Sequence, residues 1–415
     1  MSLTTLWIGL ATLAGAGGVA TGVVVMTSSG PFAHDSDSPL SQEASPTAMV
    51  TAVEARVELV AGSGEVTGAI AQGGFQDGAV DAALFDRPVG LARDPDGNLL
   101  IADAGNRRIR LLTSAGDVRT IAGTGTDGTT DGPGMSAEFR DPVDVAVGPD
   151  GTIYVVDGGS DTIRAVDAAG SVRTVAGIDY VYCTTDTKSD GPTTNPPTPP
   201  PGCPDRYEGR FRDGPAHQAI FNQPSSIVVG ANGDIFVADS GNHAVRKIDQ
   251  TGSVTTVAGN GTPGYKDGPA SDARFIAPVD LAMDADGNLY LTEQGHRVRR
   301  ISKVGVVTTV AGLRKEYGGG YNDGSSTEAE FNGPAGLAID QNGIIYVSDS
   351  QNQRIRRIDG QGNVTTVAGN GEQGFALGDG AVAEFSMPMD LEMGGENVLL
   401  VADFNLSRIL KVVLS

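Results

Sequence analysis

The chain has 415 residues, 59 of them glycine, and a formal net charge of −22 at pH 7. This length predicts several domains or one large repeat architecture, and a hydrophobic content of 39% excludes global disorder. The negative charge argues against broad nucleic-acid binding, and two cysteines with four histidines are too few for a zinc cluster or a disulfide-rich scaffold.

The N-terminal segment, residues 1–26, contains 21 consecutive uncharged residues (6–26), which are enough to span a bilayer as a hydrophobic helix. It is a membrane anchor or a signal segment, and we favour the anchor because no Lys or Arg precedes Arg56 and no clean cleavage site follows. Residues 27–54 are rich in Ser, Thr, Pro, Ala and Asp without an apolar period, which predicts a flexible tether. The expected location is outside the cytoplasm, anchored to a membrane, or secreted if the segment is cleaved.

Residues 55–415 consist of six similar units. Each unit has an Asp-Gly pair, a Phe-x-x-Pro motif and, fifteen residues after the proline, an acid. The acids are separated by 54, 82, 54, 56 and 54 residues; they are Asp103, Asp157, Asp239, Glu293, Asp349 and Asp403. A fixed period of this kind indicates a repeat architecture rather than a set of unrelated domains.

Each unit reads as four β-strands separated by turns. In the first unit the expected strands are 89–92, 99–103, 109–111 and 118–122, bounded by Gly, Asp and Asn. Four-stranded units in radial repetition form a β-propeller, so we predict an all-β fold with six blades. The last unit ends after its third strand, and residues 57–62 resemble the fourth strand at 254–259. The N-terminal strand is therefore expected to complete the last blade and close the ring.

The third unit carries the sequence Asn-Gly-Asp-Ile-Phe-Val-Ala-Asp-Ser-Gly-Asn-His-Ala-Val-Arg at 232–246. This segment resembles the signature of the NHL-repeat β-propeller family, with Asn242 and His243 as its first two letters. The pairs at 106–107 and 352–353 fit it more loosely. The resemblance implies the propeller fold over residues 55–415. It does not imply one activity, because the family includes binding modules, receptor ectodomains, RNA binders and a few lyase or lactonase relatives.

The six repeat acids are expected to be structural. An arginine follows the acid by seven residues in four units and by six in another, whereas Leu410 stands at this position in the last unit; the arginines are Arg110, Arg164, Arg246, Arg299 and Arg356. We expect acid–arginine pairs between blades, with the carboxylates also accepting N–H groups of the loop that follows. His243 and His296 are expected to be surface or packing residues.

A second set of acids stands two residues after the repeat proline. The six positions read Gly90, Asp144, Ser226, Asp280, Gly336 and Asp390, so the acids fall on alternate blades, about 120° apart on the channel rim. Three carboxylates facing one axis would attract a hard cation such as Ca²⁺. The other interpretation is a solvated acidic funnel. No cofactor is otherwise required.

One large insertion, 178–212, separates the second and third units and is rich in proline. Its two cysteines, Cys183 and Cys203, are the only ones in the chain, and we predict a disulfide between them and hence an oxidising compartment. By strand order the insertion lies on the face that carries the long Gly-rich loops. Loops on a rigid scaffold usually carry recognition, so this face is the expected binding surface.

These observations favour a non-enzymatic interaction module that binds a protein or glycan partner through its long-loop face. The alternative is a calcium-dependent hydrolase or lyase that uses Asp144, Asp280 and Asp390. No catalytic residue is identified, and no nucleophile elbow, zinc-binding helix or phosphate loop is present in the sequence.

Overall fold

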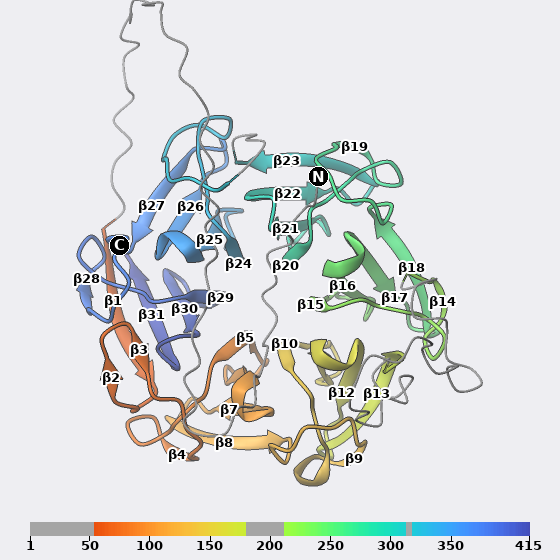
Figure 1. The fold of residues 1–415 in the computed structure, drawn as a ribbon, viewed down its shortest axis with the longest axis horizontal. Coiled ribbons are helices and arrows are strands. Elements are labelled where there is room, and N and C mark those ends of the chain that lie inside the picture. Colours follow the sequence, from red (N-terminus) through yellow and green to blue (C-terminus); the bar gives the residue numbers. More distant parts are fainter. Residues whose placement is uncertain (1–53, 180–210, 313–317) are drawn as a thin grey trace, which may run out of the picture. The chain divides into compact units, whose positions relative to one another are not determined.

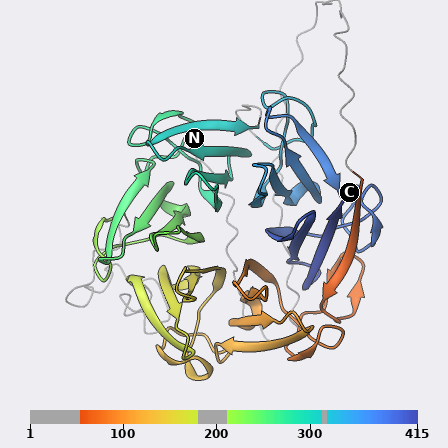
Figure 2. The same ribbon diagram turned by 180° about the vertical axis from the view of Figure 1, so that it is seen from behind.

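The computed structural model describes residues 54–179, 211–312 and 318–415. Six antiparallel sheets surround a central axis, each forming one blade of a β-propeller (Figure 1). Within these ranges the regular structure is β-strand apart from five short 3-10 turns. The prediction of an all-β, six-bladed propeller is therefore confirmed. Figure 2 shows the same ring of blades from behind.

Every blade has four main strands, ordered from the axis outward. The inner strands are β5 (Pro88–Arg93), β10 (Pro142–Val147), β15 (Pro224–Val229), β20 (Pro278–Met283), β24 (Pro334–Ile339) and β29 (Pro388–Gly395). The second strands are β6 (Leu99–Asp103), β11 (Ile153–Asp157), β16 (Ile235–Asp239), β21 (Leu289–Glu293), β25 (Ile345–Asp349) and β30 (Val398–Asp403). The third strands are β7 (Arg108–Leu112), β12 (Thr162–Val166), β17 (Ala244–Ile248), β22 (Arg297–Ile301), β26 (Arg354–Ile358) and β31 (Arg408–Leu414). The outer strands are β8 (Asp117–Ala122), β13 (Ser171–Gly177), β18 (Ser253–Ala258), β23 (Val306–Ala311), β27 (Val364–Ala368) and β1 (Ala55–Ala61).

Short elements complete the blades. Two-residue strands from the Asp-Gly segments pair with the outer strands of five blades; they are β4 (Gly78–Ala79), β9 (Gly132–Pro133), β14 (Gly214–Pro215), β19 (Gly268–Pro269) and β28 (Gly378–Asp379). A small hairpin follows β1 and consists of β2 (Val66–Thr67) and β3 (Ile70–Ala71). The 3-10 turns are η1 (Ala104–Asn106), η2 (Gly134–Ser136), η3 (Gly158–Ser160), η4 (Ser240–Asn242) and η5 (Ser350–Asn352).

The core lies between neighbouring blades, because each sheet packs one face on the blade before it and the other on the blade after it. This explains why the inner strands read as apolar runs rather than as an alternation. The phenylalanine of every Phe-x-x-Pro motif is at most 1% exposed and fills one of these interfaces; the six are Phe85, Phe139, Phe221, Phe275, Phe331 and Phe385.

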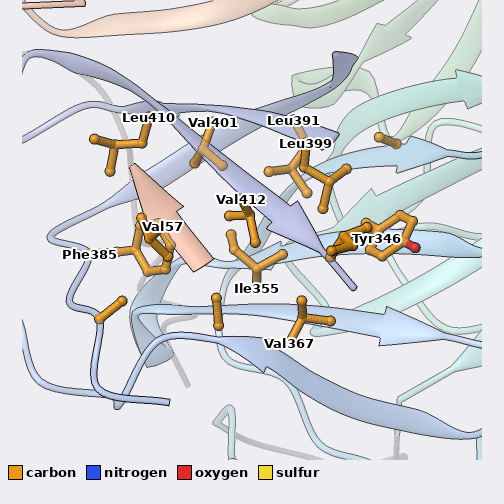
Figure 3. Packing of buried hydrophobic residues seen from close by; sticks show 14 of the residues in the cluster. Val57, Tyr346, Ile355, Val367, Phe385, Leu391, Leu399, Val401, Leu410 and Val412 are labelled. Atoms are coloured by element: carbon orange, nitrogen blue, oxygen red, sulfur yellow. The ribbon is translucent and has the colours of Figure 1, made fainter. Parts of the chain in front are cut away.

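The ring is closed by the N-terminal strand. β1 lies between β28 and β31, and its pairs with β31 run from Ala55 opposite Leu414 to Ala61 opposite Ile409. Val57 of β1 is 1% exposed and packs with Phe385 and other residues of the last blade (Figure 3). The predicted closure is confirmed, and the last blade gains a paired outer strand in place of an exposed edge.

The predictions for residues 1–26, for all but the last residue of the tether 27–54, and for Cys183 and Cys203 concern residues outside the described ranges. The expected N-terminal hydrophobic helix is therefore not supported by the structure. Inside those ranges, no helix is both long enough and apolar enough to cross a membrane.

We expect closure to depend on the buried side chain of β1. Val57→Ala removes two methyl groups from the last interface and should lower the free energy of unfolding by about 2 kcal/mol. Leu59→Ala is the matched control, because Leu59 lies on the same strand and is 41% exposed. Urea unfolding of both variants measures the difference, and equal stabilities would contradict a closing role for β1.

Candidate functional site

The repeat acids are buried inside their own blades. In the first blade Asp103 Oδ2 lies 2.6 Å from Arg110 Nη1, and Arg110 Nη2 lies 2.7 Å from Asp77 of the Asp-Gly pair. Asp103 and Arg110 are completely buried, and the guanidinium lies over the Phe85 ring. Because Arg110 is on β7 and Asp103 on the neighbouring β6, the pair joins strands of one blade. The expectation of pairs between blades is therefore wrong.

The same cluster recurs in five blades. Each arginine bridges its repeat acid and the aspartate of the Asp-Gly pair; the further sets are Asp157/Arg164/Asp131, Asp239/Arg246/Asp213, Glu293/Arg299/Asp267 and Asp349/Arg356/Asp323. Burial raises the pKa of Asp103 and Asp239 to about 6, and the arginines oppose this shift. An arginine that offsets part of the cost of burying the repeat acid explains the regular spacing in the sequence.

The acids also fix where the inner strands begin. In all six blades the carboxylate accepts the N–H of the residue two positions before the repeat proline, for example Asp86 N at 2.8 Å from Asp103. In the first blade the backbone donor belongs to the preceding segment, whereas the following loop contributes the side-chain amide of Asn106. In the last blade, where Leu410 replaces the arginine, Asp403 accepts N–H groups from Ser386, Met387 and Leu406.

The second set of acids lies at the wall of the central channel. Asp144 accepts the N–H of Val145 and, from the next blade, that of Ile227, both at 2.8 Å. Asp390 accepts the N–H of Leu391 at 2.7 Å and that of Leu91 at 2.6 Å. In both cases the two oxygens of one carboxylate join the inner strands of neighbouring blades.

Asp280 also joins the inner strands of neighbouring blades, with Ser226 as an intermediate hydrogen-bond partner. Its Oδ2 accepts the N–H of Leu337 at 2.7 Å, and its Oδ1 accepts the hydroxyl of Ser226 at 2.7 Å. The Ser226 oxygen in turn accepts the N–H of Leu281 at 3.1 Å. The N–H group three residues after the repeat proline thus finds an acceptor in all six blades. Each inner strand has a register shift near its start, and three aspartates together with Ser226 supply the acceptors that the neighbouring strand does not.

This geometry also explains the small residues on the alternate blades. A Cβ added to Gly90 would lie 2.5 Å from Asp144 Cα, and one added to Gly336 would lie 2.6 Å from Asp390 Cα. The glycines therefore make room for the aspartate of the next blade. The alternation of a small residue and an aspartate at this position around the ring follows from this packing.

The three aspartates for which the sequence predicts a calcium site act in the structure as hydrogen-bond acceptors. All six carboxylate oxygens of Asp144, Asp280 and Asp390 already accept an N–H or O–H group. Among the residues that the structure describes, no group of three or more His, Cys, Asp or Glu is placed to hold a metal ion. Burial raises the pKa of all three acids, and repulsion between them adds to the shift of Asp144 and Asp390. We derive no reaction step from them.

One face of the propeller, which we call the loop face, is formed by the loops between second and third strands and by the segments that join the blades. His243 and His296 lie in these loops with positive φ values of 52° and 61°. Their Nδ1 atoms accept the N–H of Ala277 and of Gly333 from the next blade, each at 3.0 Å. Burial lowers the pKa of both histidines. They are thus packing residues that join blades.

The outer rim of the loop face carries five aromatic–arginine stacks, which the sequence did not reveal. The guanidinium carbon lies 3.9 to 4.8 Å from the ring centre in all five; the pairs are Phe75/Arg108, Phe211/Arg246, Tyr265/Arg297, Tyr321/Arg354 and Phe375/Arg408. Three of these rings are exposed, Phe75 and Tyr321 at 46% and Phe211 at 37%. An aromatic residue two positions before the Asp-Gly pair in four of the six units is the signal that would have found most of them.

Three segments of the chain, 85–110, 221–248 and 331–358, match the model of the NHL repeat. The protein SUPPRESSOR OF QUENCHING 1, chloroplastic, from Arabidopsis thaliana is 30% identical over 311 residues, which cover 70% of this chain and 27% of that protein. NHL repeat-containing protein 2 from Homo sapiens is 28% identical over 69% of this chain and 40% of that protein. Teneurin-3 from Mus musculus is 29% identical over 65% of this chain and 10% of that protein. The chain spans less than half of each of these relatives.

Solved structures share the fold at low sequence identity. An auxiliary nutrient binding protein from Bacteroides thetaiotaomicron has a TM-score of 0.60 at 14% identity, over 89% of this chain and 79% of that one. A protein of unknown function from the same organism has a TM-score of 0.61 at 18% identity, over 87% and 76%. Similarity at this level supports the architecture alone.

We expect the channel aspartates to act as hydrogen-bond acceptors. Asp390→Ala leaves the N–H groups of Leu91 and Leu391 without their acceptors and should cost about 2–6 kcal/mol of unfolding free energy. The control is Asp96→Ala, at an exposed turn, which should change stability by at most about 0.5 kcal/mol. Urea unfolding with and without millimolar calcium measures both. A calcium-dependent gain in the unchanged protein that Asp390→Ala abolishes would contradict this role.

We also expect the two loop histidines to make stability depend on pH. Their folded-state pKa lies below the usual value near 6.5, so their contribution is present above that pH and is lost as the pH falls through the lowered pKa. Asn at both positions keeps an acceptor that does not titrate. Between pH 7.5 and 5, His243→Asn/His296→Asn should lose less unfolding free energy than the unchanged protein. His217→Asn, at an exposed position, is the control; a pH profile shared by all three proteins would refute the prediction.

Proposed function

This chain is a β-propeller of the NHL-repeat family, and we propose that it is a protein-interaction module whose partner binds the loop face. The observation that carries the proposal is the rim of exposed aromatic rings stacked on arginines. Aromatic residues, phenylalanine included, and arginine are enriched in protein interfaces, because aromatic rings offer a large rigid contact surface and arginine adds directed hydrogen bonds. Stacking on arginine holds each ring in place before a partner arrives, which lowers the entropy lost on binding.

The opposite face has a different chemistry. It consists of tight turns whose aspartates bond within the turn, as Asp94 does with Asn98 N at 2.8 Å and Asp284 with Asn288 N at 2.8 Å. These carboxylates cap their own turns, so they serve the hairpins. The contrast favours the loop face over the turn face as the binding surface.

We further propose that the propeller works outside the cytoplasm, held near a membrane by residues 1–26. The uncharged N-terminal segment and the two cysteines of the insertion support this location. Thiol labelling before and after reduction tests the predicted disulfide between Cys183 and Cys203, since free thiols in protein isolated under non-reducing conditions would speak against it. A calcium-dependent hydrolase or lyase is not proposed, because the channel carboxylates are occupied by protein donors.

A photo-crosslinking amino acid at Phe75 or Tyr321 should form a covalent product with a protein partner in the native host. The same amino acid at Ala285, in an exposed turn of the opposite face, is the control and should not. Phe75→Ala and Tyr321→Ala together should weaken the isolated complex by about tenfold or more, measured by calorimetry or surface binding. Products that form equally from Ala285 would refute the choice of face, and products removed by glycosidase would identify a glycan partner instead.

A further inference from the structure

The six inner strands enclose a cavity of about 300 Å³ along the axis. The aspartates line one part of it. The end nearer the tight turns is lined by the residues five positions after the repeat proline, which are Arg93, Val147, Val229, Met283, Ile339 and Met393. Arg93 is the single charged member of this otherwise apolar ring.

A second charge stands beside it. The position four residues after the repeat proline is Ala or Val in five blades and Glu392 in the last. Glu392 lies on β29 of the last blade and Arg93 on β5 of the first blade. These two inner strands are neighbours around the axis (Figure 1). Both line the cavity.

These opposite charges do not bond to each other. Within the described ranges no ion pair of 4 Å or less joins them, and Arg93 Nη2 instead donates to the Gly97 carbonyl at 3.3 Å. Burial raises the pKa of Glu392 to about 7, and Arg93 opposes the shift only in part. A carboxylate and a guanidinium therefore face one cavity, each with bonding capacity left over.

The fold itself does not require this pair. Five blades build the same positions from alanine, valine, methionine and isoleucine, and those side chains carry no desolvation cost. Charged groups kept at a cost to stability, at the wall of a cavity, are typical of a ligand site.

We propose that this end of the channel binds a small zwitterion of the α-amino-acid class with an apolar side chain. The ligand carboxylate binds the Arg93 guanidinium, because the paired N–H donors of a guanidinium match the two oxygens of a carboxylate. The ligand ammonium group binds Glu392. The apolar side chain packs against Met283 and Met393. A cavity of about 300 Å³ is at the small end of ligand sites, which suits a molecule of this size. The site is separate from the loop face, so this proposal is independent of the function proposed above.

Isothermal titration calorimetry at pH 8 with leucine or methionine tests the proposal directly. 4-Methylpentanoate and 3-methylbutylamine carry the leucine skeleton with one charge each, and both should bind about tenfold or more weakly than the zwitterion. Affinity should also fall as the pH drops below about 7, because protonated Glu392 no longer offers a carboxylate to the ammonium group.

The variants use residues that other blades already place at these positions. Arg93→Met copies Met393, and Glu392→Ala copies Ala92, so both should fold, with melting temperatures that confirm it. Each should lose about tenfold or more in affinity; Glu392→Gln serves if Glu392→Ala does not fold. No binding of either amino acid at millimolar concentration, or binding that survives both substitutions, would overturn the proposal. An amine that binds as tightly as the zwitterion would overturn the role of Arg93.

Discussion

The propeller depends on how its innermost strands satisfy their backbone. Each of these strands has a sheet partner on its outer side alone, and the register shift near its start turns one N–H group away from that partner. A buried N–H without an acceptor costs about 1–3 kcal/mol, and a ring of six blades has six of them. Asp144, Asp280 and Asp390 satisfy all six, with the help of Ser226. At the position two residues after the repeat proline, half of the blades must therefore carry the aspartate, and the other half must carry a small residue.

The outer part of each blade is organised around a buried arginine. Arg356, for example, joins the acid that ends the second strand to the Asp-Gly segment that runs along the outer strand. The last blade lacks this arginine and is completed by β1, with apolar contacts of Val57 and Leu410 where the other blades have the ion pair. The buried ion pairs thus connect strands inside a blade, whereas the channel aspartates and the apolar core connect neighbouring blades.

The repeat period was sufficient to predict the architecture. The spacing of the acids fixed six blades, and the likeness between residues 57–62 and the other fourth strands predicted closure. The sequence predicted a structural role for the repeat acids but could not show the role of the channel acids. Asp144 and Asp390 look like metal ligands on alternate blades until the register shift reveals the N–H groups they serve. Arg110 looked like a link between blades because sequence spacing does not state which strands are neighbours. Glu392 and Arg93 lie 299 positions apart in the sequence, and only the closure of the ring brings both to the wall of one cavity.

Closure also brings the first and last residues of the propeller together. Ser415 N donates to the Glu54 carbonyl at 3.0 Å, beside the antiparallel pairing of β1 with β31. A peptide linker joining these ends would span a few residues and disturb no strand. The circle could then be opened at a tight turn such as 284–288, giving a permuted chain that keeps every blade and moves both termini to the turn face.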